Sequence, residues 1–177
     1  MLPETKSAIL HDIDVAIERA LIGRSCRSLI LMSENSTELS VLIDCVQALI
    51  NEKRQITRQV FVQNGLSLQS LIQDSLPKLA SDFNIIFDLD GTPSELVSDI
   101  FTEIGTTLVK KNLSWILLID RLDAAEAADL EMLISAIHAS NQKSLPILCI
   151  GVGSPQLTKM IGDAKPYAER LFQFKTI

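Results

Sequence analysis

The sequence predicts an α/β fold, a three-layer, doubly wound and mainly parallel sheet with helices on both faces. Short, continuous apolar runs such as residues 28–32 (SLILM) are typical of strands that are covered on both sides. These runs alternate with longer stretches in which apolar residues recur every three or four positions, the spacing of one helix face. Strands and helices that alternate in this way form βαβ units, which produce a parallel sheet.

Each element follows from its local pattern. The predicted strands are residues 28–32, 59–62, 84–89, 115–119, 146–152 and 172–174. The predicted helices have apolar faces within residues 9–21, 39–50, 68–72, 96–108 and 130–137.

Four short signals mark expected helix ends. Gly23 supplies a stop after the first helix, and Ser67 is placed to cap the third. Residues 92–95 (TPSE) have a capping-box layout, with proline at the first helical position. Residues 154–155 (SP) predict a second cap followed by a proline in the first turn.

Length and composition favour one packed globular domain. The chain has 177 residues, of which 47% are hydrophobic and 21% are charged. Its three cysteines are odd in number and form no C-x-x-C pair, so we expect buried thiols in a reducing compartment. No stretch resembles a signal peptide or a membrane span. These observations predict a cytoplasmic protein, and the net charge of −6 disfavours binding to nucleic acid.

The C-terminal third carries a specific resemblance. The strand WILLI at residues 115–119 leads into Asp120 and a helix, and is followed by PILCIGV at 146–152 and YAERLF at 167–172. This order resembles the AAA+ ATPase domain of bacterial ATP-binding proteins related to origin-recognition initiators, and the likeness extends more loosely back to Arg27. It implies a single AAA+-like P-loop domain over 1–177, with an N-terminal helix and connection over 1–27 and a core over 28–177. We expect neither a lid nor a winged-helix domain in this sequence.

The same resemblance places the phosphate-binding loop of the family, the Walker A motif G-x-x-x-x-G-K-[ST], on residues 33–40 (SENSTELS). In the motif, glycines let backbone N–H groups surround the phosphates, and the lysine binds the β and γ oxygens. Ser33 and Glu38 replace the two glycines, and Leu39 replaces the lysine. The vestigial positions in this stretch are Ser33, Ser36, Glu38, Leu39 and Ser40, of which Ser40 keeps the hydroxyl of the motif.

The second nucleotide motif, Walker B, is also altered. Asp120 is retained, but Arg121 stands where the family has the glutamate that activates water. A unit-charge pair at about 4 Å contributes about 4 kcal/mol at an effective dielectric near 20. Leu39 removes a cation that would attract the phosphates, and Glu38 adds an anion that would repel them. We therefore predict no ATP binding, no hydrolysis, no cofactor and no metal. The alternative for residues 33–37, a plain surface loop with a serine or threonine cap, also lacks a P-loop.

A competing motif lies at residues 85–92 (IIFDLDGT). It resembles motif I of the haloacid dehalogenase phosphatases, which implies Asp88 as nucleophile and Asp90 as general acid/base beside Mg²⁺. That family begins with this motif, whereas here it lies in the middle of the chain. The other interpretation is a strand end followed by an Asp-Gly turn. An unconventional nucleotide-binding ATPase is the second enzymatic alternative.

The sequence therefore favours a non-enzymatic, degenerate AAA+-like ATPase domain that acts as a protein-interaction, regulatory or assembly module. The expected partner is another protein or a second copy, without nucleic acid or membrane. Arg170 is the candidate interaction residue, and we expect it to be exposed or paired with a carboxylate. His11 and His138 are expected at helix surfaces, and Trp115 in the core.

Overall fold

The computed structural model describes residues 4–63, 66–84 and 93–177, and its sheet has five strands in the order β2-β3-β4-β1-β5. Every pair of neighbouring strands in this sheet is parallel, which confirms the predicted fold class. The strands are β1 Ser28–Met32, β2 Ile56–Phe61, β3 Trp115–Asp120, β4 Ile147–Gly153 and β5 Phe172–Thr176.

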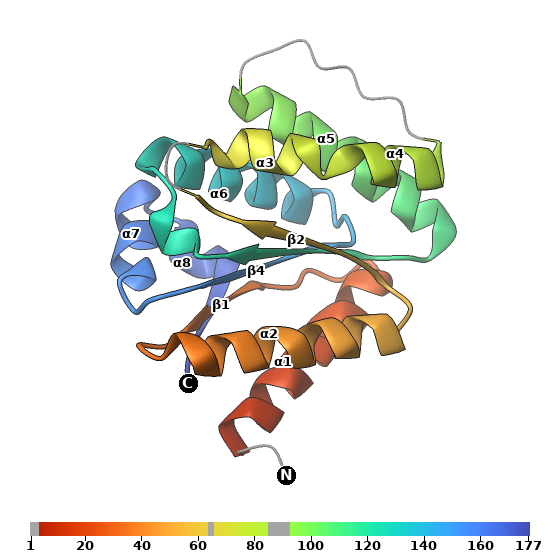
Figure 1. Cartoon of the computed structure of the whole chain (residues 1–177). Coiled ribbons are helices and arrows are strands. Elements are labelled where there is room, and N and C mark those ends of the chain that lie inside the picture. Colours follow the sequence, from red (N-terminus) through yellow and green to blue (C-terminus); the bar gives the residue numbers. More distant parts are fainter. Residues whose placement is uncertain (1–3, 64–65, 85–92) are drawn as a thin grey trace.

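Helices cover both faces of the sheet. Figure 1 shows α1 and α2 below the sheet and α3 to α6 above it. The helices are α1 Glu4–Leu21, α2 Ser36–Glu52, α3 Leu68–Asp74, α4 Leu76–Phe83, α5 Pro93–Lys111, α6 Ala127–Gln142, α7 Leu157–Ala164 and α8 Ala168–Leu171, with a 3₁₀ turn η1 at Leu122–Ala124. None of the helices in the described ranges combines the length and apolarity that crossing a membrane requires.

The sheet separates two apolar cores. Alternate residues of a strand point to opposite faces, so Leu29 and Leu31 pack against α1 and α2, whereas Ile30 belongs to the core on the other side. In β3, Ile116 and Leu118 face α1 and α2 in the same way. Both faces are covered, which explains why the strand sequences are continuously apolar.

Three of the four predicted helix-end signals are confirmed, the one at 92–95 in its proline. Gly23, two residues after the end of α1, has a φ of +68°, a conformation that glycine adopts without a steric penalty. The Ser67 hydroxyl accepts a hydrogen bond from the N–H of Ser70 at 3.1 Å and caps α3. The proline predicted at the first helical position, Pro93, begins α5.

The prediction for residues 154–155 is wrong. The helix α7 begins at Leu157, and Ser154 lies in a turn before it, where its carbonyl accepts from the N–H of Leu157. The backbone N–H of Ser154 donates to the Asp123 carboxylate at 3.1 Å. This bond holds Ser154 at the end of β4, so the chain turns once more before it becomes helical.

Other predictions differ in their limits. β2 begins three residues before the predicted start, because Thr57 and Arg58 interrupt the apolar run of an edge strand whose side chains are partly exposed. Asn84, the first residue of the strand predicted at 84–89, is instead the C-cap of α4 with a φ of 53°, so the predicted start of that strand is wrong. The rest of that strand and the threonine of the capping box at 92–95 fall on positions 85–92, outside the described residues. The helix α4 was not predicted.

Candidate functional site

The candidate site lies where parallel strands end at one edge of the sheet. The stretch 33–40 follows β1, the turn at 120–123 follows β3, and Ser154 follows β4. These segments and the end of β2 surround one hollow of about 320 Å³. The structure thus brings the predicted Walker A and Walker B positions together.

Asn35 organises the loop after β1. Its side-chain oxygen accepts from the backbone N–H groups of Thr37 at 3.0 Å and Glu38 at 3.4 Å, which makes it the N-cap of α2. Its carbonyl accepts from the N–H of Leu39 at 3.3 Å. Three consecutive N–H groups therefore have acceptors within the protein. Sequence reasoning missed Asn35, although an asparagine just before a helical stripe is a standard capping signal.

Ser33 and Glu38 close the loop on itself. The Ser33 hydroxyl, in a residue only 6% exposed, accepts from the N–H of Asn35 at 3.0 Å and donates to a Glu38 carboxylate oxygen at 3.3 Å. Ser40 donates back to the carbonyl of Ser36 at 3.0 Å. Leu39 is partly buried against the α1 and α2 core. The predicted Walker A positions thus bond to one another or, in the case of Leu39, pack against the core.

Replacing Asn35 with alanine is expected to lower the free energy of unfolding by about 1 kcal/mol, because two N–H groups at the start of α2 lose their acceptor. Urea denaturation of both proteins measures the difference. Asn35→Ser keeps an acceptor and should fall within a few tenths of the wild type. A serine variant as unstable as the alanine variant would contradict this role for the side chain.

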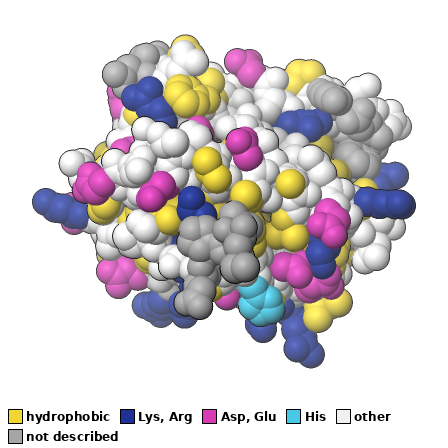
Figure 2. Space-filling model, turned by 60° about the horizontal axis from the view of Figure 1, so that its bottom comes forward, with side chains coloured by type: hydrophobic (Ala, Val, Ile, Leu, Met, Phe, Trp, Pro, Cys, Tyr) yellow, Lys and Arg dark blue, Asp and Glu magenta, His cyan; other side chains and the backbone are white. Residues whose placement is uncertain are grey.

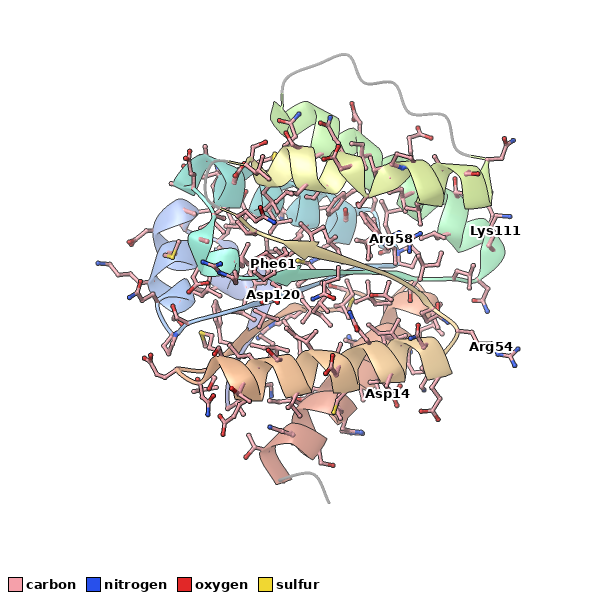
Figure 3. All side chains as sticks on the ribbon, in the orientation of Figure 1. Asp14, Arg54, Arg58, Phe61, Lys111 and Asp120 are labelled. Atoms are coloured by element: carbon pink, nitrogen blue, oxygen red, sulfur yellow. The ribbon has the colours of Figure 1, made fainter. Side chains whose placement is uncertain are left out.

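The opposite wall consists of the turn after β3. Arg121 has a φ of 54°, and its guanidinium lies 5.4 Å from the centre of the Phe61 ring, within the range of a cation–π contact. Phe61 pairs with Asp120 in the β2–β3 register, and Figure 3 shows both residues at the same end of the sheet. Sequence reasoning missed Phe61, because its role depends on the pairing of two distant strands.

Two carboxylates next to this turn have different environments. Burial raises the pKa of Asp120, while the backbone N–H and the charge of Arg121 act in the opposite direction. Asp123 instead accepts the Ser154 N–H, and it lies so near the Gly153 backbone that a β-carbon there would be 2.6 Å from the Asp123 carboxylate. A side chain at the end of β4 would therefore force the carboxylate of Asp123 to move.

The charges around the hollow are mainly negative. Glu34, Asp120 and Asp123 contribute three carboxylates, and Arg121 contributes one guanidinium, which leaves a formal charge of −2. Across the described ranges, no group of three or more His, Cys, Asp or Glu residues is arranged to hold a metal ion. The geometry offers polar groups to a ligand but little compensation for the charge of a triphosphate.

The remaining predicted site residues lie elsewhere. Asp88 and Asp90 are outside the described residues. Arg170 is exposed in α8, and no described carboxylate forms a salt bridge with it. His138 is partly exposed on α6, with its ring centre 4.9 Å from that of Tyr167.

The comparisons with known proteins concern the fold. No model of a known protein family matches the sequence, and no curated protein is detectably similar to it. Solved structures do match. The chain resembles Cdc6p from Pyrobaculum aerophilum with a TM-score of 0.61 and 16% identity, over 99% of this chain and 46% of that one. It resembles a chain of Drosophila ORC bound to poly(dA/dT) DNA and Cdc6 with a TM-score of 0.66 and 10% identity, over 98% and 28%.

A third structure extends the comparison to a nucleotide complex. The Aeropyrum pernix ORC2 protein in ADPNP–ADP complexes matches with a TM-score of 0.60 and 14% identity, over 100% of this chain and 49% of that one. This chain therefore has the fold of the AAA+ domains of origin-recognition initiators, which confirms at the level of fold the resemblance predicted from the sequence. It spans about half or less of the length of these neighbours.

Proposed function

We propose that this chain is a non-enzymatic AAA+-like domain that serves as a protein-interaction, regulatory or assembly module and neither binds nor hydrolyses ATP. The observation that carries the proposal is the closed loop after β1. The N–H groups of Thr37, Glu38 and Leu39 are bonded to Asn35, whereas a phosphate-binding loop directs its N–H groups at the ligand.

The side chains support the same conclusion. Leu39 offers no cation where the motif has lysine, and Glu38 adds an anion beside the loop. At the Walker B turn, Arg121 stands where the motif has glutamate, so this position offers no carboxylate to activate water. Positioning and neutralisation of charge are most of what a protein contributes to phosphoryl transfer.

A protein partner, or a second copy, is the proposed ligand of the domain. Drosophila ORC assembles with Cdc6 and DNA, but a net charge of −6 disfavours nucleic acid for this chain. On the face shown in Figure 2, acidic and basic side chains are interspersed. The exposed Arg170 is the proposed interaction residue. Three free cysteines are consistent with action in the cytoplasm.

We also propose that residues 1–177 form one domain. The apolar residues of α1, including Ile13 and Ile17, are fully buried in the same core as α2 and the lower face of the sheet. On this basis the N-terminal helix is part of the folded unit that assembles with the partner.

Calorimetric titration with ATP·Mg²⁺ tests the central statement. We expect no saturable heat from the wild-type protein up to a ligand concentration of about 1 mM. A dissociation constant of about 1 mM corresponds to a binding free energy of about −4.1 kcal/mol. A dissociation constant at or below about 100 μM, roughly −5.5 kcal/mol, would overturn the proposal.

The variant Leu39→Lys sharpens this test. It restores the cation of the motif, but the Asn35 cap and the Glu38 carboxylate stay in place, so we expect it to gain no affinity. Val41→Lys is the matched control, because it adds the same charge to α2 at a residue that is 44% exposed. Tight ATP binding by Leu39→Lys alone would show that the closed loop opens readily for phosphate.

A further inference from the structure

A second depression lies at the opposite edge of the sheet, where strands begin. The β1–β5 register pairs Ser28 with Phe172, so the residues before these strands, Arg27 and Leu171, are neighbours. Together with α1 and the second half of α6 they surround a groove of about 680 Å³. This is about twice the volume of the hollow at the candidate site, 320 Å³.

Arginine side chains from three separate parts of the sequence line this groove. They are Arg19 in α1, Arg27 before β1 and Arg170 before β5. No salt bridge joins any of them to a carboxylate of the described residues. The acidic residue of the lining, Asp12, is already paired with Lys175 at 2.5 Å. The lining therefore has three guanidinium groups and one carboxylate, a formal charge of +2 in a chain of net charge −6.

Part of the groove is fixed in place. The Nε and Nη2 atoms of Arg19 donate to the carbonyl of Ser25 at 3.1 and 3.0 Å, which orients the guanidinium. A guanidinium has five N–H donors, so three are left for a ligand. Asn141 and Gln142 on α6 add amide donors at the same groove. Because Arg19 is held before a ligand arrives, less conformational entropy is lost on binding.

We propose that this groove binds a small organic anion that carries at least two phosphate or carboxylate groups. Guanidinium groups bind both kinds of group through two parallel hydrogen bonds, which a single ammonium cannot do. The volume lies within the range of small-molecule sites, about 300 to 1,000 Å³. Val15 and Leu171 supply an apolar wall for the carbon skeleton. This site is separate from the candidate nucleotide site. It shares Arg170 with the interaction surface proposed above, but the binding of a small anion does not depend on a protein partner.

Titration calorimetry of the whole chain at low salt, without Mg²⁺, tests the site. The probes are fructose 1,6-bisphosphate for phosphate groups and citrate for carboxylate groups. We expect at least one probe to bind with a dissociation constant below about 1 mM. The affinity should fall steeply between 50 mM and 500 mM KCl, because salt screens exposed charges.

Arg27→Gln and Arg170→Gln locate the binding. Each removes one charge-assisted contact and should weaken the binding of the better probe by about tenfold or more. Arg24→Gln removes the same charge from an exposed residue of the same connection that does not line the groove, and should change the affinity less than twofold. Thermal melts verify that all variants fold.

Three outcomes would overturn the proposal. One is the failure of both probes to bind at 5 mM, and another is an equal loss in Arg24→Gln and Arg27→Gln, which would indicate unspecific attraction to positive charge. The third is binding that Leu39→Lys changes but Arg27→Gln does not, because the ligand would then occupy the other edge of the sheet. Preference for one probe distinguishes a phosphorylated ligand from a polycarboxylate.

Discussion

Replacing Trp115 with alanine is expected to lower the free energy of unfolding by about 3 to 5 kcal/mol, the usual effect of removing a large aromatic side chain from a core. Trp115 is fully buried at the start of β3, and its ring meets that of Phe101 on α5 edge to face, with centroids 5.3 Å apart. The indole therefore joins the central sheet to a long helix. Chemical denaturation at several urea concentrations measures the difference.

Two further variants make this prediction specific. Among the described residues the buried indole N–H of Trp115 has no hydrogen-bond acceptor, so Trp115→Phe removes a poorly satisfied donor and should destabilise much less than alanine. Val109→Ala removes apolar atoms from a residue that is 57% exposed on α5 and should change stability by less than about 0.5 kcal/mol. An effect of Trp115→Ala as small as that of Val109→Ala would contradict the packing described here.

The buried strands were predictable because their environment is simple. Both faces of β1 and β3 are covered, so almost every side chain is apolar and the limits of the strand coincide with the limits of the apolar run. β2 is an edge strand with one buried residue, Val60, among partly exposed ones, so its start could not be read from hydrophobicity. α4 was missed because Pro77 was not recognised as a residue of a first helical turn.

The candidate site was predictable only in its position. The order of strands in the sequence places Ser33 and Asp120 at the carboxyl ends of β1 and β3, and carboxyl ends of parallel strands share one edge of the sheet. The hydrogen bonds of Asn35 and the position of Arg121 over Phe61 depend on local geometry and on strand pairing. No spacing in the sequence indicates them.

The arginine groove could not be predicted from the sequence at all. Arg19 and Arg170 are separated by most of the chain and belong to no shared motif. They meet because β5 adds to the edge of the sheet beside β1, while α1 covers one face of it. A site assembled in this way is visible only after the topology is known.

Gly151→Ala is expected to destabilise the fold by about 1 to 3 kcal/mol, the usual effect of overpacking a core. A β-carbon on Gly151 in β4 would lie 2.5 Å from a methyl group of Leu122 and 2.8 Å from one of Ile30. Both neighbours are fully buried, so neither can move aside without disturbing the core. Because Leu122 belongs to η1, the disturbance should also shift Asp123 away from the Ser154 N–H, which links core packing to the shape of the candidate site.

The matched control for this variant changes stability in the opposite direction. Gly162 lies within α7, and a β-carbon there would come no closer than 3.8 Å to another group, the Glu169 carboxylate. Gly162→Ala should therefore stabilise the protein by up to about 1 kcal/mol, since alanine favours a helix more than glycine does. Urea denaturation of the two variants tests the sign as well as the size of each effect. If Gly151→Ala is as stable as the wild type, then β4 and η1 are not in direct contact, and the candidate site is shaped by some other part of the chain.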